Sequence, residues 1–394
     1  MFRRVYLDNA ATTPIDPEVV DAMMPYLTNK FGNASSIHFF GQETRAAVDK
    51  ARQQVASLIK CRPAELIFTS GGTEANNLAI RGLIEAQQTS NGHTLHIITS
   101  AIEHPSVSNV CEDLEKHGVR VTYLPAYESG VIRVSDVEAA ISDDTVLISV
   151  MAANNEIGTL QPVAEIGKIV KTLRGEGRKI WFHVDAVQAA GKIPLDVEEI
   201  QCDLMSVSAH KIYAPKGVGV LFIRRGTRLH QQNVGGRQER GVRGGTESVP
   251  LIVAFGKAAE LAEERLKEDP QRLGKLRDAL EDRVFEQIND AVLNGERETR
   301  LPNVSNISFS GVEGEGLLIN LDLQGIAVST GSACSSGSLE PSPVIRALGR
   351  NDDLARSAIR FSLGRENSME DIDRLLEVLP ASVENLRRLS PDKK

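Results

Sequence analysis

Three short segments carry residues that can bind an anion, hold a proton and bond covalently to a carbonyl compound. The first is Ser70–Glu74, where two glycines and a threonine stand between a strand-like segment and a helical one. Such a turn directs free backbone N–H groups toward an anion, typically a phosphate. Gly-Gly turns are also common as plain connections. The spacing is neither G-x-G-x-x-G nor a P-loop, so the segment indicates neither a dinucleotide nor a nucleoside triphosphate.

An acid and a lysine follow at the ends of two later strand-like segments. Asp185 comes just past the apolar segment Ile180–Val184, at the edge of an α/β sheet where ligands bind. It can cap a helix, or it can keep a heterocyclic nitrogen protonated, as pyridoxal phosphate requires. Lys211 ends the segment Ser206–Lys211. Beside a phosphate turn and an acid, this lysine is better explained as a Schiff-base lysine than as a surface residue.

The four cysteines are scattered and form no C-x-x-C pair, which indicates neither a zinc site nor a disulfide framework and favours a reducing cytoplasm. Cys61, Cys111 and Cys202 lie in or beside helical and strand patterns, where cysteine usually packs as a small hydrophobe. Cys334 is different, because Ser329–Ser338 consists of small residues and predicts a mobile loop. Such a loop can carry a thiolate into a pocket and out again.

Composition excludes several classes of protein. The chain has 394 residues, 41% of them hydrophobic and 25% charged, which is ordinary for a globular protein and long enough for two domains. Its formal net charge of −8 argues against general nucleic-acid binding. Apolar runs such as Val146–Ala153 are strand-sized, so we expect no membrane span, and the N-terminus has no signal-peptide pattern.

Strand-like and helical segments alternate over the first part of the chain and predict an α/β fold with a mostly parallel sheet of seven strands. The predicted strands are Glu65–Thr69, Leu95–Thr99, Arg120–Leu124, Val146–Met151, Ile180–Val184, Leu204–Ser208 and Val218–Ile223. A charged helical stretch from Pro250 marks a boundary between a large domain, 15–250, and a smaller α+β domain, 1–14 plus 251–394, which carries the cysteine loop. In the smaller domain we predict three strands and a last helix capped by Ser368: Ile307–Phe309, Leu317–Leu321 and Ile359–Leu363.

The ordered set of motifs resembles the fold-type I pyridoxal-phosphate enzymes of the class V aminotransferase superfamily, and specifically the NifS/IscS-type cysteine desulfurases. The resemblance covers nearly the whole chain. The motifs are Leu7–Pro14, Phe31–His38, Ser70–Glu74, Glu103-His104, Asn154–Gly158, His183–Gln188, Ser208–Lys211, Arg243–Thr246, Gly331–Pro341 and Ile359–Gly364.

The resemblance implies a role for each matching residue. Lys211 holds pyridoxal phosphate through a Schiff base, Asp185 pairs with its ring nitrogen and Gln188 bonds its 3′-oxygen. His104 stacks on the ring and acts in proton transfer. The phosphate contacts are Gly72, Thr73, Ser208 and His210, joined by Thr246 from a second subunit. Asn155 and Arg360 hold the substrate carboxylate, and Asn155 also contacts the cofactor. Taken singly, His104 fits a turn residue, Arg360 the polar face of a strand and Thr246 a helix cap.

The resemblance also implies the reaction. L-Cysteine is converted to L-alanine, and its sulfur passes to Cys334 as a persulfide that supplies iron–sulfur cluster assembly and other thio-cofactors. The implied partners are a second copy of the chain and an iron–sulfur scaffold or another sulfur acceptor, with no nucleic acid and no membrane. We expect no resident metal, only a contact of Cys334 with a cluster during transfer. The alternative is a selenocysteine lyase or another β-eliminating pyridoxal-phosphate enzyme. A transaminase and a catalytically silent scaffold are the remaining alternatives.

Overall fold

The computed structural model describes residues 4–88, 94–330 and 340–389. Its central element is a sheet with strand order β2-β8-β7-β6-β5-β3-β4. β8 runs antiparallel to both neighbours, whereas the strands from β7 to β4 are parallel to one another. This confirms the mostly parallel seven-stranded sheet. The strands are β2 (Leu66–Thr69), β3 (His96–Ser100), β4 (Arg120–Leu124), β5 (Thr145–Met151), β6 (Trp181–Asp185), β7 (Leu204–Ser208) and β8 (Gly219–Ile223).

Helices cover both faces of this sheet because its buried side chains alternate between them. On β3, Ile97 packs in a cluster with residues of α3 and α4, whereas the next residue, Ile98, packs in a cluster with residues of α2, α6 and α8. α8 lies close along α2, since a Cβ at Gly256 would stand 2.5 Å from the Ala51 Cα. The helices are α1 (Pro17–Leu27), α2 (Phe39–Leu58), α3 (Gly72–Gln87), α4 (Pro105–Lys116), α5 (Val134–Ala140), α6 (Val163–Gly175), α7 (Val197–Ile200) and α8 (Val249–Arg265).

A second hydrophobic core lies around a three-stranded antiparallel sheet of order β12-β10-β9. β1 (Val5–Tyr6) pairs in parallel with β11 (Ile326–Ala327) beside it. The other strands are β9 (Ala291–Leu293), β10 (Val304–Phe309) and β12 (Ala358–Ser362). The helices are α9 (Asp269–Gln287), α10 (Gly314–Leu323), α11 (Pro343–Ala347), α12 (Asp352–Arg356) and α13 (Met369–Leu389).

Two sequence predictions for this second part had different outcomes. The strand predicted over Leu317–Leu321 is wrong, because these residues belong to α10, where Leu317 and Leu321 are buried one turn apart. A short apolar run has no periodicity that separates a strand from a buried helical face. The predicted start of the last helix is confirmed, since the Ser368 backbone N–H donates to Asp371 Oδ2 at 3.2 Å.

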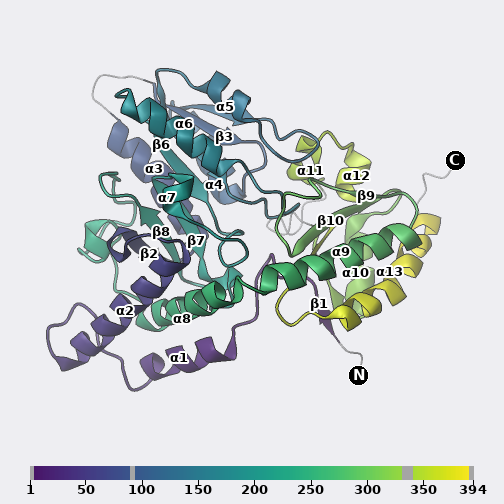
Figure 1. Cartoon of the computed structure of the whole chain (residues 1–394), viewed down its shortest axis with the longest axis horizontal. Helices are drawn as coiled ribbons and strands as arrows, with labels where there is room; N and C mark the ends of the chain where they lie inside the picture. The colour runs from purple at the N-terminus through teal and green to yellow at the C-terminus, as the bar shows by residue number, and fades with distance from the viewer. Residues whose placement is uncertain (1–3, 89–93, 331–339, 390–394) are drawn as a thin grey trace.

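The junction between the two cores lies between α8 and α9, which follow one another in Figure 1. Phe255 and Ala262 of α8 pack in the core of the large sheet, whereas Leu280 and Val284 of α9 pack in the second core. The division predicted at residue 250 stays a prediction. Because α8 packs with the large sheet, we propose that the boundary lies in the connection 266–268.

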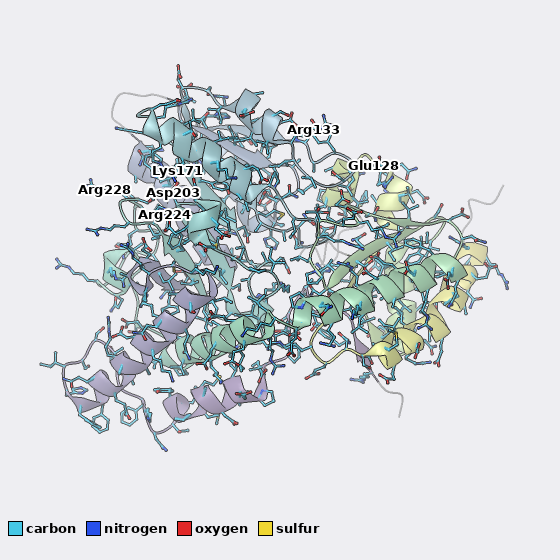
Figure 2. The ribbon with its side chains drawn as sticks, in the orientation of Figure 1. Glu128, Arg133, Lys171, Asp203, Arg224 and Arg228 are labelled. Carbon is cyan, nitrogen blue, oxygen red and sulfur yellow. The ribbon has the colours of Figure 1, made fainter. Side chains whose placement is uncertain are left out.

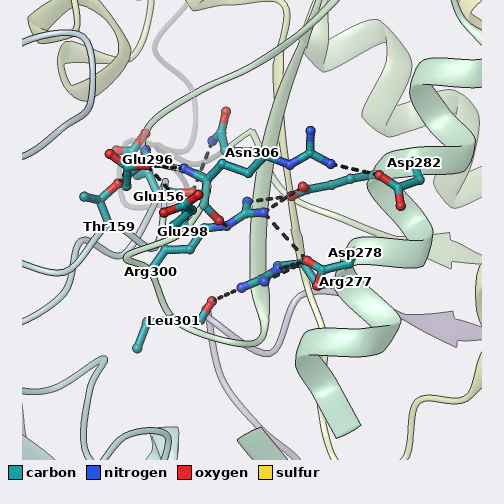
Figure 3. Close-up of polar contacts among 12 residues, drawn as sticks. Glu156, Thr159, Arg277, Asp278, Asp282, Glu296, Glu298, Arg300, Leu301 and Asn306 are labelled. Carbon is teal, nitrogen blue, oxygen red and sulfur yellow. Dashed lines mark hydrogen bonds and ion pairs between the residues drawn. The ribbon is translucent and has the colours of Figure 1, made fainter. Parts of the chain in front are cut away.

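A buried ion pair fixes α9 to the segment that precedes β10. Arg300 Nη1 and Nη2 donate to Glu281 Oε1 and Oε2 at 2.6 and 2.7 Å. Both side chains are almost fully buried, at 1% and 0% exposure. Figure 3 shows Arg300 with Asp278, also of α9, whose Oδ1 lies 3.9 Å from Arg300 Nη2. The next residue, Leu301, donates its backbone N–H to Gly158 O at 2.8 Å, which joins this segment to the turn after β5.

Charged side chains close the edge of the large sheet opposite the carboxyl ends of its parallel strands. Asp203 precedes β7 and Arg224 follows β8, and the two lie side by side (Figure 2), where the Arg224 backbone N–H donates to Asp203 O at 2.8 Å. The buried Asp203 carboxylate is paired with Arg174 and accepts the Phe182 backbone N–H at 2.8 Å. We therefore look for a ligand site at the other edge of the sheet, where the parallel strands have their carboxyl ends.

Candidate active site

The carboxyl ends of β5, β6 and β7 surround a cavity of about 270 Å³. These strands end at Met151, Asp185 and Ser208, and all three residues line the cavity. The structure brings most of the predicted site residues to this one place. The full lining consists of Ala11, Gly72, Thr73, His104, Ser106, Met151, Ala153, Asn155, Asp185, Val187, Gln188, Ser208, His210 and Lys211.

One side of the cavity is suited to an anion. The N-terminus of α3 begins at Gly72, and the first N–H groups of a helix have no partner within it. A Cβ at Gly72 would stand 2.8 Å from Val187 Cγ2, so the close approach of this turn requires glycine. Burial, followed by the charges of nearby lysines, lowers the pKa of His210 to about 4. His210 is therefore neutral at pH 7, and its ring N–H can donate a hydrogen bond to an anion.

Asp185 is held in place by two donors. Its Oδ2 accepts from Asn76 Nδ2 at 2.7 Å, and its Oδ1 accepts from the Val187 backbone N–H at 3.0 Å. Asn76 also donates to Ser106 Oγ at 2.8 Å. Sequence reasoning missed Asn76 and Ser106. The available signal was an asparagine on the apolar face of a helix, three residues after Thr73, where a buried amide requires partners.

Lys211 lies against the N-terminal segment of the chain. Its Nζ donates to the carbonyl oxygens of Ala10 and Ala11 at 2.6 and 2.7 Å. Gln188 Nε2 also donates to Ala10 O, at 3.0 Å. The predicted Schiff-base lysine and the predicted contact to the 3′-oxygen thus share one backbone carbonyl.

His104 is the N-cap of α4, and its position fixes its tautomer. Its Nδ1 accepts from the Ser106 backbone N–H at 3.1 Å and lies 2.8 Å from Ser106 Oγ. Because Nδ1 is an acceptor, the proton of the neutral ring is on Nε2. Burial lowers the pKa of His104, as does the charge of Lys211, and Asp185 opposes both. The ring is therefore neutral at pH 7.

Arg360 adjoins the cavity without being one of its lining residues. Its side chain is 2% exposed and comes from β12, in the second core. Nη1 donates to Asn155 O at 2.8 Å, and Nη2 donates to Asp8 Oδ1 at 2.9 Å. Nε is buried without a hydrogen-bond partner among the described residues. The guanidinium is thus oriented by two acceptors and keeps a donor for a third.

Thr246, like Arg360, is not one of the residues that line this cavity. Thr246 is exposed in the loop before α8. Cys334 lies outside the described residues. Of the described cysteines, Cys111 and Cys202 are buried and Cys61 is half-buried, and all three are free thiols. Burial raises the pKa of Cys61 and of Cys111 to about 12.

Two kinds of feature are absent from the described residues. We find no group of three or more His, Cys, Asp or Glu side chains that could hold a metal ion among them. In the same part of the chain, no helix is long and apolar enough to cross a membrane.

The donor set fits pyridoxal phosphate, because an anion turn, a carboxylate and a lysine converge on one cavity. Comparison with known proteins agrees. The chain belongs to the class V aminotransferase family, whose model matches residues 5–375. This family uses pyridoxal phosphate.

Within that family the chain is a member of the NifS/IscS-type cysteine desulfurases. It is 50% identical to the cysteine desulfurase IscS of Dictyoglomus turgidum over 100% of this chain and 98% of the relative. It is 48% identical to the human cysteine desulfurase over 99% of this chain and 84% of the relative. A solved NifS-like protein matches with a TM-score of 0.90 and 37% identity, over 98% of this chain and 100% of that chain.

Proposed function

We propose that this protein is a pyridoxal-phosphate-dependent cysteine desulfurase that converts L-cysteine to L-alanine and passes the sulfur to Cys334. One observation carries the proposal: Lys211, Asp185 and the N-terminus of α3 face one cavity in a chain about half identical to named cysteine desulfurases. When bound, the cofactor supplies an electron sink that stabilises negative charge on the substrate Cα. In this site Lys211 attaches it, Asp185 keeps its ring nitrogen protonated and Gln188 bonds its 3′-oxygen. The phosphate contacts are Gly72, Thr73, Ser208 and His210.

Arg360 and Asn155 hold the substrate carboxylate. A guanidinium grips a carboxylate through two parallel N–H donors, which fixes the orientation of the Cα–H bond. Asp8 and the Asn155 carbonyl orient the Arg360 guanidinium, and its unpartnered Nε supports the presence of one more acceptor.

His104 serves in proton transfer. The protonated ring can release a proton from Nε2, while Nδ1 stays 2.8 Å from Ser106 Oγ. Because burial lowers its pKa, a protonated His104 gives its proton up readily.

Sulfur leaves the substrate through Cys334. The Cys334 thiolate attacks the substrate sulfur, a bond forms between the two sulfur atoms, and the Cβ–S bond breaks with its electron pair going to the carbon fragment. That fragment is protonated and released as alanine, and a persulfide stays on Cys334. The raised pKa values of Cys61 and Cys111 support this choice, since the thiolate is the nucleophile and these thiols are poor sources of it.

The working enzyme is a homodimer in which Thr246 completes the phosphate site of the other subunit. Exposed apolar side chains support an interface near α1 and α2: Phe31, Ile37 and Phe39 are 72%, 90% and 73% exposed. Its location is the cytoplasm, in line with the free thiols of the described cysteines. The persulfide is passed to an iron–sulfur scaffold or another sulfur acceptor.

The test is to incubate the purified protein with L-cysteine and a thiol reductant and to quantify alanine and sulfide. We expect equal amounts of both from the wild type, loss of both in Cys334→Ala, and retention in the control Cys61→Ser. Pyruvate and ammonia instead would contradict desulfuration and indicate a β-eliminating relative.

Mixed dimers test the role of Thr246. In a dimer of Lys211→Ala with Thr246→Val chains, a trans arrangement leaves one site with both native residues, so mixing two weak variants restores activity. If Thr246 served the site of its own chain, no site in the mixture would be native and activity would stay low.

A further inference from the structure

Lys192 is a second lysine beside the cofactor cavity, and the proposed mechanism gives it no role. It lies in the turn after β6 and is only partly exposed. Its Nζ donates to Gln188 O at 3.0 Å and to Gln188 Oε1 at 3.2 Å. Lys192 and Lys211 both line a small second cavity of about 20 Å³. A lysine in this position can influence Gln188 and Lys211, which it contacts or adjoins.

The contact with Lys192 fixes the orientation of the Gln188 side-chain amide. An ammonium or amine donor must face the carbonyl oxygen of the amide, so Oε1 points to Lys192. The –NH₂ group then points the other way, where one of its two protons is donated to Ala10 O at 3.0 Å. Turning the amide over would bring two donors together. The second proton of Nε2 is therefore available to the cavity that Gln188 lines.

The same contacts lead on to Lys211. Ala10 O accepts both from Gln188 Nε2 and from Lys211 Nζ, the latter at 2.6 Å. A continuous series of hydrogen bonds thus joins Lys192 to Lys211 through the Gln188 amide and one backbone carbonyl.

We propose that Lys192 is a positioning residue that fixes the Gln188 amide and thereby sets the proton affinity of the nitrogen through which Lys211 holds the cofactor. The inference rests on the proposed roles of Lys211 and Gln188. A donor to the 3′-oxygen withdraws electron density from the adjoining nitrogen and lowers its affinity for a proton. Without Lys192, the amide loses its fixed orientation and that affinity rises.

The charges around Lys192 determine whether the orientation of the Gln188 amide varies with pH. Lys211 and Arg360 are like charges near it, and Asp269 and Arg365, which pair with each other at 3.2 Å, line the same small cavity. Burial, followed by the charges of Lys211 and Arg360, lowers the pKa of Lys192 to about 7. Because a neutral amine still donates, the amide stays fixed on both sides of that pH.

The experiment titrates the visible absorbance of the holoenzyme against pH without any cysteine. Lys192→Met removes the donor, Lys192→Gln keeps a donor without the charge, and Lys168→Met removes an exposed lysine of α6 as the matched control. We expect the titration midpoint to rise by about one unit, a tenfold change in proton affinity, in Lys192→Met. It should lie near the wild-type value in Lys192→Gln and stay unchanged in Lys168→Met.

The double variant separates orientation from charge. If Lys192 acts through Gln188, then Lys192→Met added to Gln188→Ala produces little further shift, because coupled residues are not additive. A shift of full size in the Gln188→Ala background, or an equal shift in Lys192→Met and Lys192→Gln, would show that the charge acts directly on Lys211 and would overturn the proposal. No shift in any variant would overturn it as well.

Cofactor loss is also informative. If Lys192→Met folds, by far-UV circular dichroism, but loses the cofactor while Lys192→Gln keeps it, the proposal stands; loss from both, with the fold intact, overturns it. A wild-type protein without a visible band would instead contradict the proposed function itself.

Discussion

Replacing Asn76 by leucine tests how the acid of the cofactor site is held. Asn76 is fully buried in α3 and donates to Asp185 Oδ2 at 2.7 Å and to Ser106 Oγ at 2.8 Å. Leucine has the same number and branching of side-chain heavy atoms, so α3 keeps a similar shape while both hydrogen bonds are lost. Among the described residues, Asp185 then keeps its contact with the Val187 backbone N–H, at 3.0 Å.

The magnitude follows from the kind of bond that is removed. A hydrogen bond to a charged group contributes about 1.5–3 kcal/mol. At about 1.4 kcal/mol for each factor of ten, the loss corresponds to a roughly 10- to 150-fold lower affinity for the cofactor. The same orientation is needed during the reaction, so the rate of alanine formation should fall as well.

The assay is titration of the cofactor-free protein with pyridoxal phosphate, followed by the absorbance of the bound form. Gln87→Leu, at the half-exposed last residue of α3, is the matched control and should bind as the wild type does. Far-UV circular dichroism checks that both variants fold. Cofactor affinity and rate within threefold of the wild type in Asn76→Leu would refute the view that Asn76 positions Asp185.

Three further predictions concern stability and reactivity. Glu281→Leu leaves the buried Arg300 with Asp278, 3.9 Å away, as its remaining carboxylate among the described residues, and should destabilise the fold by about 3–5 kcal/mol in thermal or denaturant unfolding. Adding Arg300→Met should restore most of that stability, and equal losses in the single and double variants would contradict this. Burial lowers the pKa of His183 from 6.5 to about 4, so the unfolded chain takes up a proton first as the pH falls, and the fold should lose about 3 kcal/mol between pH 6.5 and 4. In His183→Asn, the free energy of unfolding should change less between pH 6.5 and 4. An unchanged slope of this free energy against pH would show that His183 is not the cause of the loss. Because burial raises the pKa of Cys111 to about 12, iodoacetamide at pH 7 should label Cys334 first, as peptide mass spectrometry would show, and prior labelling of Cys111 would contradict that raised pKa.

The strands of the large sheet could be predicted from the sequence to within one residue at either end. Each is a short apolar run between turn residues, and the alternation with helices leaves little freedom of arrangement. Leu317–Leu321 was mispredicted as a strand because the same kind of run also forms the buried face of a helix. β9, over Ala291–Leu293, was not predicted, because its three half-buried residues show no alternation of buried and exposed side chains.

The site was predictable only where a motif marks the end of a strand. Asp185 and Ser208 stand at such ends, where a parallel sheet brings its ligand contacts together. Asn76 and Lys192 act through side chains that reach their partners only after α3 and the turn behind β6 have packed. The Ala10 carbonyl could not be predicted either, because a backbone acceptor has no residue type to recognise.

The role proposed for Arg360 would make substrate recognition depend on the packing between the two cores. It extends from β12 in the second core, but its acceptors are Asn155 in the turn after β5 and Asp8 near the N-terminus. A guanidinium fork has to match a carboxylate closely in direction, so a small displacement of one core against the other would misalign it. The bond from Leu301 N to Gly158 O, next to the Arg300–Glu281 ion pair, ties the segment before β10 to the turn that carries Asn155. The buried ion pair therefore bears on catalysis as well as on stability, and breaking it should raise KM for L-cysteine even at temperatures where the protein stays folded.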